Sequence, residues 1–206
     1  MLGPIPTRFG DPSPEHLKMM QVVPERFDGS LTGIIVPPPP PINFESMRTE
    51  LATTMRHTAD PQLDPVFCEQ VDSDMVPPIV MLAREHGIDV DPEEIAGVIS
   101  DLIPVILRLK YRFNTPRPWQ VSSSLGASLR RLASPSSMTP SYPSGHAIQA
   151  ATACTALGER FPHAARDLSA LASAIGMSRL QLGVHFPVDV VVGLKIGKQI
   201  GRRIGL

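Results

Sequence analysis

The chain is poor in cysteine and has almost no net charge, and each scarcity excludes a class of protein. Of its 206 residues only Cys68 and Cys154 are cysteines, too few for a disulfide framework. Cys154 lies in an apolar helical run and is expected to be a buried thiol. The formal net charge is −1, so the chain lacks the basic surplus of a nucleic-acid-binding protein. We therefore expect no nucleic-acid partner.

Long apolar runs are also missing. The best candidate for a membrane span, residues 95–107, is interrupted by Asp101 and Pro104, whereas a spanning helix needs about 18 or more apolar residues. The first residues have neither a basic start nor an apolar core, so no signal peptide is visible. These absences predict a soluble protein, cytoplasmic or otherwise, without a membrane span.

What the chain does contain is helical periodicity. Hydrophobic residues make up 42% of the sequence, enough for one packed core, and no alternating strand pattern of useful length appears. The pattern predicts an all-α fold, a single-domain helical bundle. Start and stop signals place its helices at about 43–57, 65–71, 76–86, 91–113 with a kink at Pro104, 145–159, 162–182 and 187–204. The Ser-rich stretch 121–141 is expected to be a loop with room for a short helix.

Proline is abundant, and it concentrates in residues 1–43, which include five consecutive prolines from Pro37 to Pro41. This segment is expected to contain no helix and to run extended, partly as polyproline II. It is either a ligand for a proline-binding domain or, as we favour, an arm that packs along the body or reaches a neighbouring subunit. A homo-oligomer is therefore left open. The predicted division is an extended arm, 1–43, and a helical catalytic domain, 44–206.

Glycine recurs at every fourth position in the last predicted helix, at Gly193, Gly197, Gly201 and Gly205. In lipid, this spacing is typical of a membrane dimer face. Lysines and arginines interrupt the apolar surface here, so we favour close packing on another helix of the same chain.

Three segments carry chemistry. The first, Pro143 to His146, precedes a helix, where Ser144 serves either as a simple N-cap or, with Gly145, as part of an anion site at the positive end of the helix dipole. In the second, Lys110 lies in the last turn of a helix, and Arg117 stands between two prolines that restrict its backbone.

The third segment places Arg179 and His185 on either side of one tight corner, with Asp189 in the first turn of the next helix. Asp189 can hydrogen-bond one ring nitrogen of His185 and leave the other as an unprotonated nucleophile. Each segment alone has an ordinary structural explanation. Together they supply the cations, N–H donors and two histidines that phosphoryl transfer needs.

These residues resemble the three-part signature of the type 2 phosphatidic acid phosphatase superfamily, over about residues 95–200. The pattern Lys-x6-Arg-Pro, Pro-Ser-Gly-His, Ser-Arg-x5-His-x3-Asp is met at Lys110, Arg117 and Pro118, at Pro143 to His146, and at Ser178, Arg179, His185 and Asp189. The superfamily includes membrane lipid phosphatases, soluble class A bacterial acid phosphatases and vanadium-dependent haloperoxidases, all with a helical core.

The resemblance implies a metal-independent, acid-phosphatase-like hydrolase that acts through a phosphohistidine. His185 would be the nucleophile, His146 the general acid and then base, and Asp189 the residue that orients His185. The implied phosphate ligands are Lys110, Arg117, Ser144, Gly145 and Arg179, with no metal and no cofactor. The alternative is a vanadium-dependent haloperoxidase, in which vanadate would occupy the same anion site.

The partner expected on this basis is a soluble, small-molecule phosphomonoester. Phe113, Trp119 and Tyr142 flank the motifs and either line an entrance or, more commonly, belong to the core. The remaining histidines and the acidic pairs are expected to be surface, capping or solvated groups without a role at the site: His16, His57, His86, His163, Glu93 with Glu94, and Asp72 with Asp74.

Overall fold

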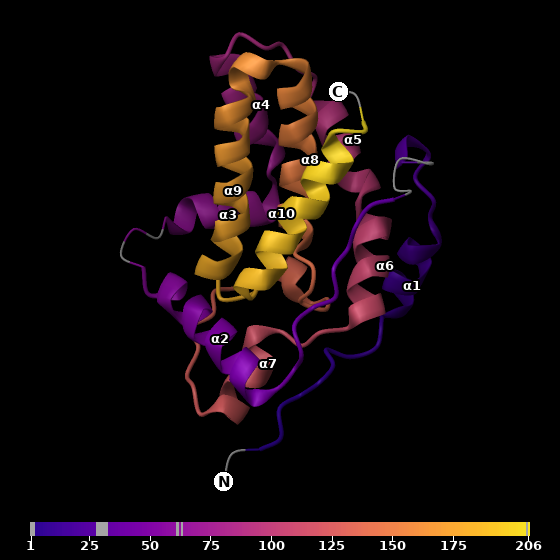
Figure 1. Ribbon diagram of the computed structural model, residues 1–206. Coiled ribbons are helices and arrows are strands. Elements are labelled where there is room, and N and C mark those ends of the chain that lie inside the picture. The colour runs from indigo at the N-terminus through magenta and orange to yellow at the C-terminus, as the bar shows by residue number, and fades with distance from the viewer. Residues whose placement is uncertain (1–2, 28–32, 61, 63, 205) are drawn as a thin grey trace.

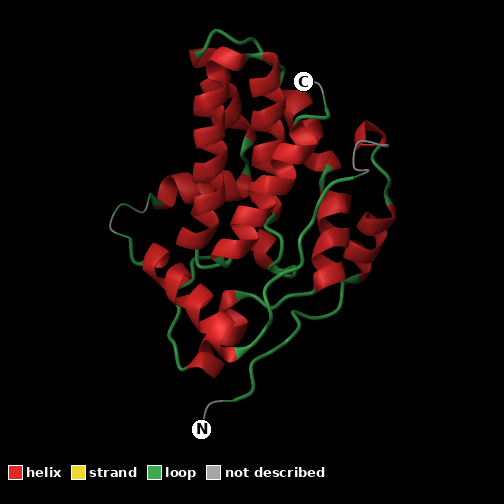
Figure 2. Ribbon diagram, in the orientation of Figure 1, coloured by secondary structure: helices red, strands yellow, loops and turns green. Residues whose placement is uncertain are grey.

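The computed structural model describes residues 3–27, 33–60, 62, 64–204 and 206. Every regular element in this part of the chain is helical (Figure 2), so the predicted all-α, single-domain fold is confirmed. The α-helices are α1 (Pro14–Gln21), α2 (Phe44–Thr58), α3 (Pro65–Ser73), α4 (Val76–Glu85), α5 (Pro92–Asp101), α6 (Ile103–Phe113), α7 (Pro118–Ser122), α8 (Gly145–Arg160), α9 (Ala165–Gln181) and α10 (Pro187–Gly201).

The centre of the molecule is the group α8, α9 and α10, which lie side by side (Figure 1). Helix α8 is rich in buried alanines, and α10 faces it with the predicted glycine stripe. A Cβ on Gly193 would lie 2.7 Å from the Ser144 carbonyl, and one on Gly201 would lie 2.6 Å from the Thr152 carbonyl. The prediction of close intramolecular helix packing is confirmed, while Gly205 lies outside the described residues.

Local signals account for the helix starts. Asn43 caps α2 through its side-chain oxygen, which accepts from Ser46 N at 2.9 Å, and Asp91 caps α5 in the same way. The predicted long helix with a kink at Pro104 is instead two helices that break at Leu102. Pro104 occupies the second position of α6, where its missing N–H costs no hydrogen bond, so the chain restarts a helix there rather than bending one.

The prediction that residues 1–43 run extended without a helix is wrong for Pro14–Gln21. Pro14 stands at the first helical position, where its fixed φ favours a helix. The Ser13 hydroxyl caps the same turn by accepting from His16 N at 3.1 Å. The prediction from proline content alone therefore missed helix α1.

The other described parts of this segment run along the body (Figure 1). The Gln199 side chain exchanges hydrogen bonds with the backbone of Ile35 at 3.0 and 3.1 Å, and the Tyr142 hydroxyl donates to the Pro37 carbonyl. The division at residue 43 stays a prediction.

Candidate active site

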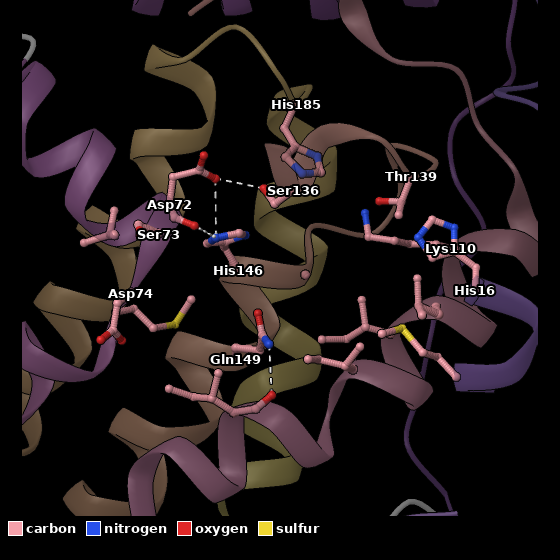
Figure 3. Close-up of a pocket in the computed structure, with 18 of the residues that line it drawn as sticks. His16, Asp72, Ser73, Asp74, Lys110, Ser136, Thr139, His146, Gln149 and His185 are labelled. Atoms are coloured by element: carbon pink, nitrogen blue, oxygen red, sulfur yellow. Dashed lines mark hydrogen bonds and ion pairs between the residues drawn. The ribbon is translucent and has the colours of Figure 1, made fainter. Parts of the chain in front are cut away.

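The predicted site residues lie at helix ends that converge on one cavity of about 370 Å³ (Figure 3). Lys110 is in the last turn of α6, and Arg117 immediately precedes α7. Gly145 and His146 open α8, whereas His185 lies just before α10. All five line the cavity. Segments as far apart as residues 110 and 185 therefore meet because the helices that carry them end at the same place.

The other three predicted residues lie behind this wall. Arg179, in the last turn of α9, and Asp189, in the first turn of α10, are both buried but do not line the cavity. Ser144 is also buried, and its hydroxyl caps α8 by accepting from Ala147 N at 3.5 Å. The capping interpretation of Ser144 thus matches its contacts, and its role toward a phosphate stays a prediction.

His185 is held by hydrogen bonds at both ring nitrogens. Its Nδ1 lies 3.0 Å from Asp189 Oδ2, and its Nε2 lies 2.9 Å from Arg117 Nη1. Because a guanidinium only donates, Nε2 must accept, and the ring proton is therefore on Nδ1. Burial, reinforced by the nearby Arg117, holds the pKa of His185 well below its ordinary value. The ring is neutral, with its lone pair on Nε2.

Asp189 keeps this ring in place through the local turn. Pro187 opens α10, and the Asp189 carboxylate folds back to accept from Phe186 N at 2.9 Å as well as from the Ser141 hydroxyl. Burial raises the pKa of Asp189 to about 6, although these hydrogen bonds oppose the rise. A carboxylate with several donors is a rigid support for the His185 ring.

Three cations are buried around the two histidines. Lys110 Nζ donates to the carbonyls of Pro140 and Ser141, at 2.7 and 3.2 Å. Burial, and next the neighbouring Arg117, lowers the pKa of Lys110 well below its ordinary value, and burial lowers that of Arg117 to about 9. Arg179 Nε is buried without a hydrogen-bond partner in the described part of the molecule. Asp189 offsets part of this positive charge, and a bound anion would offset more of it.

Asp72, near the end of α3, is the residue that sequence reasoning missed. It was expected to be a solvated loop charge, but its side chain is only 7% exposed and its Oδ1 lies 2.7 Å from Arg179 Nη1. The same atom lies 3.6 Å from His146 Nε2 (Figure 3). No motif in its neighbourhood marks it, because its role depends on α3 packing against α9.

The pKa values of this pair follow from their surroundings. Burial by itself would raise the pKa of Asp72, but Arg179, the Ser136 hydroxyl and His146 outweigh burial and leave it below the ordinary value. The pKa of His146 is lowered to about 3, first by burial and then by Arg179, while Asp72 acts in the opposite direction. His146 is therefore neutral near pH 7 in the unliganded protein, and Asp72 is its nearest source of negative charge.

Gly145 allows the two cavity walls to approach. A Cβ at this position would lie 3.1 Å from Ile106 Cγ2 and 3.7 Å from Lys110 Cε. A Cβ would therefore require the Ile106 side chain to shift by a few tenths of an ångström, whereas its distance to Lys110 is that of ordinary van der Waals contact. Gly145 therefore makes room for Ile106 beside His146.

The Ser-rich stretch 121–141 contributes to the cavity in a way its composition did not indicate. Ser136 and Thr139 line the wall, and the hydroxyls of Ser134 and Ser136 accept from Arg179 Nη2 at 2.9 and 3.1 Å. The same two hydroxyls donate to Asp72, at 3.0 and 2.8 Å. Hydrogen bonds from this loop therefore hold the Arg179–Asp72 ion pair in place.

The flanking aromatic residues do not line this cavity. Tyr142 is fully buried, with Phe113 edge-on at a ring distance of 5.2 Å, and Trp119 lies under the Arg131 guanidinium at 3.9 Å. The core interpretation therefore holds. Among the other histidines, His86 pairs with Asp167 at 3.1 Å away from the site. His16 is half-buried on α1 and lines the cavity, which its sequence context did not indicate.

Comparison with known proteins identifies the family. The model of the PAP2 superfamily matches residues 95–202, which is more than half of the chain, and the chain belongs to this superfamily. No curated protein matches. Among the described residues, no helix is long and apolar enough to cross a bilayer.

Two solved structures share the fold. A bacterial vanadium-dependent iodoperoxidase is 18% identical, with a TM-score of 0.63 over 82% of this chain and 51% of its own. A transmembrane PAP2-type phosphatidylglycerolphosphate phosphatase from Bacillus subtilis is also 18% identical, with a TM-score of 0.54 over 91% of this chain and 89% of its own. The chain therefore spans about half the length of the iodoperoxidase.

Proposed function

We propose that the protein is a phosphomonoester hydrolase that works through a phosphohistidine. One observation carries this proposal: a buried, neutral His185 keeps its lone pair on Nε2 within a cavity walled by Lys110 and Arg117. A neutral imidazole is a nucleophile, and the adjacent cations would draw a phosphate dianion toward it.

In the first half of the reaction, His185 Nε2 attacks phosphorus as the ester P–O bond breaks. Arg117, which donates to Nε2 in the free protein, would transfer that donor to a phosphate oxygen when substrate binds. Lys110 and the start of α8 would hold the remaining oxygens. Asp189 would stabilise the positive charge that develops on the ring, because it accepts from Nδ1.

His146 would give its proton to the leaving oxygen in this step. Its pKa of about 3 in the free protein means that the proton must be acquired with the substrate. A bound dianion raises the pKa of a neighbouring histidine, and Asp72 already contributes in the same direction. We assign Asp72 a positioning role: it holds His146 and Arg179 and does not touch the reacting atoms.

In the second half, a water molecule attacks the phosphohistidine and gives its proton to His146. The P–N bond breaks, phosphate leaves, and His185 returns to its neutral form. The positive charge that a metal ion contributes in other phosphatases would come here from Lys110, Arg117 and Arg179.

A vanadium-dependent haloperoxidase is the second candidate, supported by the fold likeness to the iodoperoxidase. The residues fit vanadate, because His185 Nε2 carries a lone pair and Arg179 Nε is a buried donor without a hydrogen-bond partner among the described residues. His185, Lys110 and Arg117 would hold the vanadate, and Arg179 would add positive charge from its buried position next to the cavity. Bound vanadate would supply peroxide activation for halide oxidation.

The cavity wall favours hydrolysis. Beyond the charged end, the cavity is lined mainly by apolar side chains, among them Val71, Met75, Ile99, Ile106 and Leu107. A wall of this kind accommodates the organic leaving group of a monoester, whereas halide and peroxide have no carbon skeleton to place there.

The deciding experiment assays one purified preparation for p-nitrophenyl phosphate hydrolysis with and without a chelator, and for bromide and iodide oxidation after vanadate loading. We expect hydrolysis that survives chelation and that vanadate inhibits. Halide oxidation at a catalytic rate without hydrolysis would overturn the proposal in favour of the haloperoxidase.

A further inference from the structure

Helix α1 contributes a wall to the cavity although it lies outside the residues that match the family model. His16 and Met19 are three residues apart, so they share one face of α1, and both line the cavity. In Figure 3, the His16 ring projects from the same side as Lys110, across from Asp72 and His146. The organic part of a bound substrate, which extends away from the charged end of the cavity, would therefore contact α1.

The position of α1 is set by contacts to the helix that carries Lys110 (Figure 1). Arg108 donates to the carbonyls of Met20 and Val22, at 2.8 and 2.9 Å. At the other end, Asn114 accepts from the backbone N–H groups of Phe9 and Gly10, at 2.9 and 3.2 Å. Hydrogen bonds at both ends of α1 thus fix its register on α6, and in this register the His16 face of α1 is turned toward the cavity.

One ring nitrogen of His16 is committed to the protein. Its Nδ1 lies 2.8 Å from the Tyr111 hydroxyl. The Tyr111 hydroxyl is protonated, with a pKa that burial raises, so it can donate to Nδ1 as well as accept from it. In the tautomer whose Nδ1 accepts from Tyr111, the ring proton of His16 lies on Nε2. Nε2 has no hydrogen-bond partner among the described residues, and the ring lines the cavity.

We propose that His16 and Met19 determine specificity for the leaving group, with His16 Nε2–H donating to an oxygen on the organic part of the substrate and Met19 packing on its carbon skeleton. The substrate class is then a phosphomonoester that is apolar next to the ester and carries a hydroxyl or carbonyl oxygen further along. This inference rests on the proposed hydrolase function and specifies which leaving groups the hydrolase prefers.

The test compares n-alkyl phosphates with ω-hydroxyalkyl phosphates of equal length, from two to six carbons. The wild-type protein should prefer the hydroxyalkyl member in kcat/KM at one or two adjacent lengths, by about fivefold, as expected for one hydrogen bond. His16→Phe should abolish the preference, His16→Gln should retain part of it because an amide N–H remains, and Tyr111→Phe should weaken it. Lys18→Ala, an exposed change on α1, should leave it unchanged.

Met19→Ala should have a different signature. We expect kcat/KM for the longer members of both series to fall by about threefold. Methylene contacts with Met19 are lost whether or not the hydroxyl is present. The rate of phosphoenzyme hydrolysis, measured by rapid quench, should be the same in all α1 variants, since the leaving group has departed by then. A change in that rate would mean that α1 acts on the charged end, and the proposal would be wrong.

Binding of the matching alkyl- and hydroxyalkylphosphonates, measured by calorimetry, separates this inference from the hydrolase proposal. Phosphonate discrimination that disappears in His16→Phe, in a protein without phosphatase turnover, would support the α1 role and overturn the hydrolase function. Equal binding of both series at every length, or a preference that survives His16→Phe, would overturn the α1 role.

Discussion

Two regions of the chain, residues 16–75 and residues 99–185, supply the side chains that line the cavity, but they reach it by different routes. The later helices present their residues at helix ends: Lys110 in a last turn, His146 in a first turn, and His185 just before a proline-initiated helix. The earlier segments supply Asp72 and His16 from short helices, α3 and α1, whose places depend on what they pack against. The first route leaves a signature in local sequence, and the second does not.

The two routes also differ in how the packing is secured. Helix α10 lies against α8 through glycines that bring backbone against backbone, an arrangement that tolerates no added atom. Helix α1 is fastened to α6 by a few polar contacts, and none of its residues is fully buried. We therefore expect atoms added at the α8–α10 contact to destabilise the fold, and changes on the exposed face of α1 to leave the fold intact.

The largest effect should come from His185→Ala. Removing the nucleophile should lower kcat by about 10⁴-fold or more, while the circular dichroism spectrum stays unchanged. Rapid-quench trapping should show an acid-labile, alkali-stable phosphoenzyme in the wild type alone. His57→Ala on α2 is the matched control and should retain full activity. Turnover of His185→Ala near the wild-type level would rule out a phosphohistidine.

Next in size is Asp72→Asn, which tests the contribution of the earlier segments. We expect kcat to fall on the order of 10- to 100-fold, because His146 loses the carboxylate that favours its protonated form. Removing that charge lowers the pKa of His146 further, so the alkaline limb of the pH–kcat profile should move to lower pH. Glu69→Gln, at an exposed carboxylate of the same helix α3 that does not line the cavity, should move neither. An unshifted profile would show that Asp72 acts only through the fold.

Gly193→Ala sharpens the contrast in packing. The new Cβ would lie 2.7 Å from the Ser144 carbonyl and 2.9 Å from Ala147 Cβ, so α10 must shift away from the start of α8. We expect a loss of about 2 kcal/mol in the free energy of unfolding, measured by urea denaturation. Gly97→Ala in α5 meets only the flexible end of Arg26 and should be neutral or slightly stabilising. Equal effects of the two substitutions would contradict the backbone-contact account.

A pH dependence of stability of similar size to the Gly193→Ala effect is expected from His146. The folded-state pKa of His146, about 3, lies below the unfolded value of 6.5, so between these values the unfolded chain binds more protons. Stability is therefore lost as the pH falls below 6.5. Between pH 7 and 5 this one group accounts for about 2 kcal/mol, or about 5 °C in Tm.

His146→Gln removes that proton uptake, so its Tm should fall less than that of the wild type over the same pH range. Saturating phosphate should also reduce the wild-type loss, because the anion favours protonated His146. Parallel Tm profiles for the wild type and His146→Gln would mean that this histidine titrates normally in the folded protein.

Most of the helical framework was predictable because capping and proline signals act over a single turn. Asn43, Asp91 and Pro187 each begin a helix where the sequence indicated. Two expectations about proline were wrong: Pro14 was placed in an extended segment, and Pro104 was expected to kink a continuous helix. Both stand in the first turn of a helix, which accepts proline. At this range, position within the turn matters more than residue type.

The sequence by itself determined the later part of the site, because Lys110, Arg117, His146, His185 and Asp189 stand at fixed spacings within helix-end segments. Only the tertiary structure decided that Asp72 reaches Arg179 and His146, and that His16 faces the same cavity. The physical reason is the range of the interactions involved. Caps and turns are set by neighbours within a few residues, whereas α3 and α1 take their places from contacts with α9 and α6, residues far away in the chain.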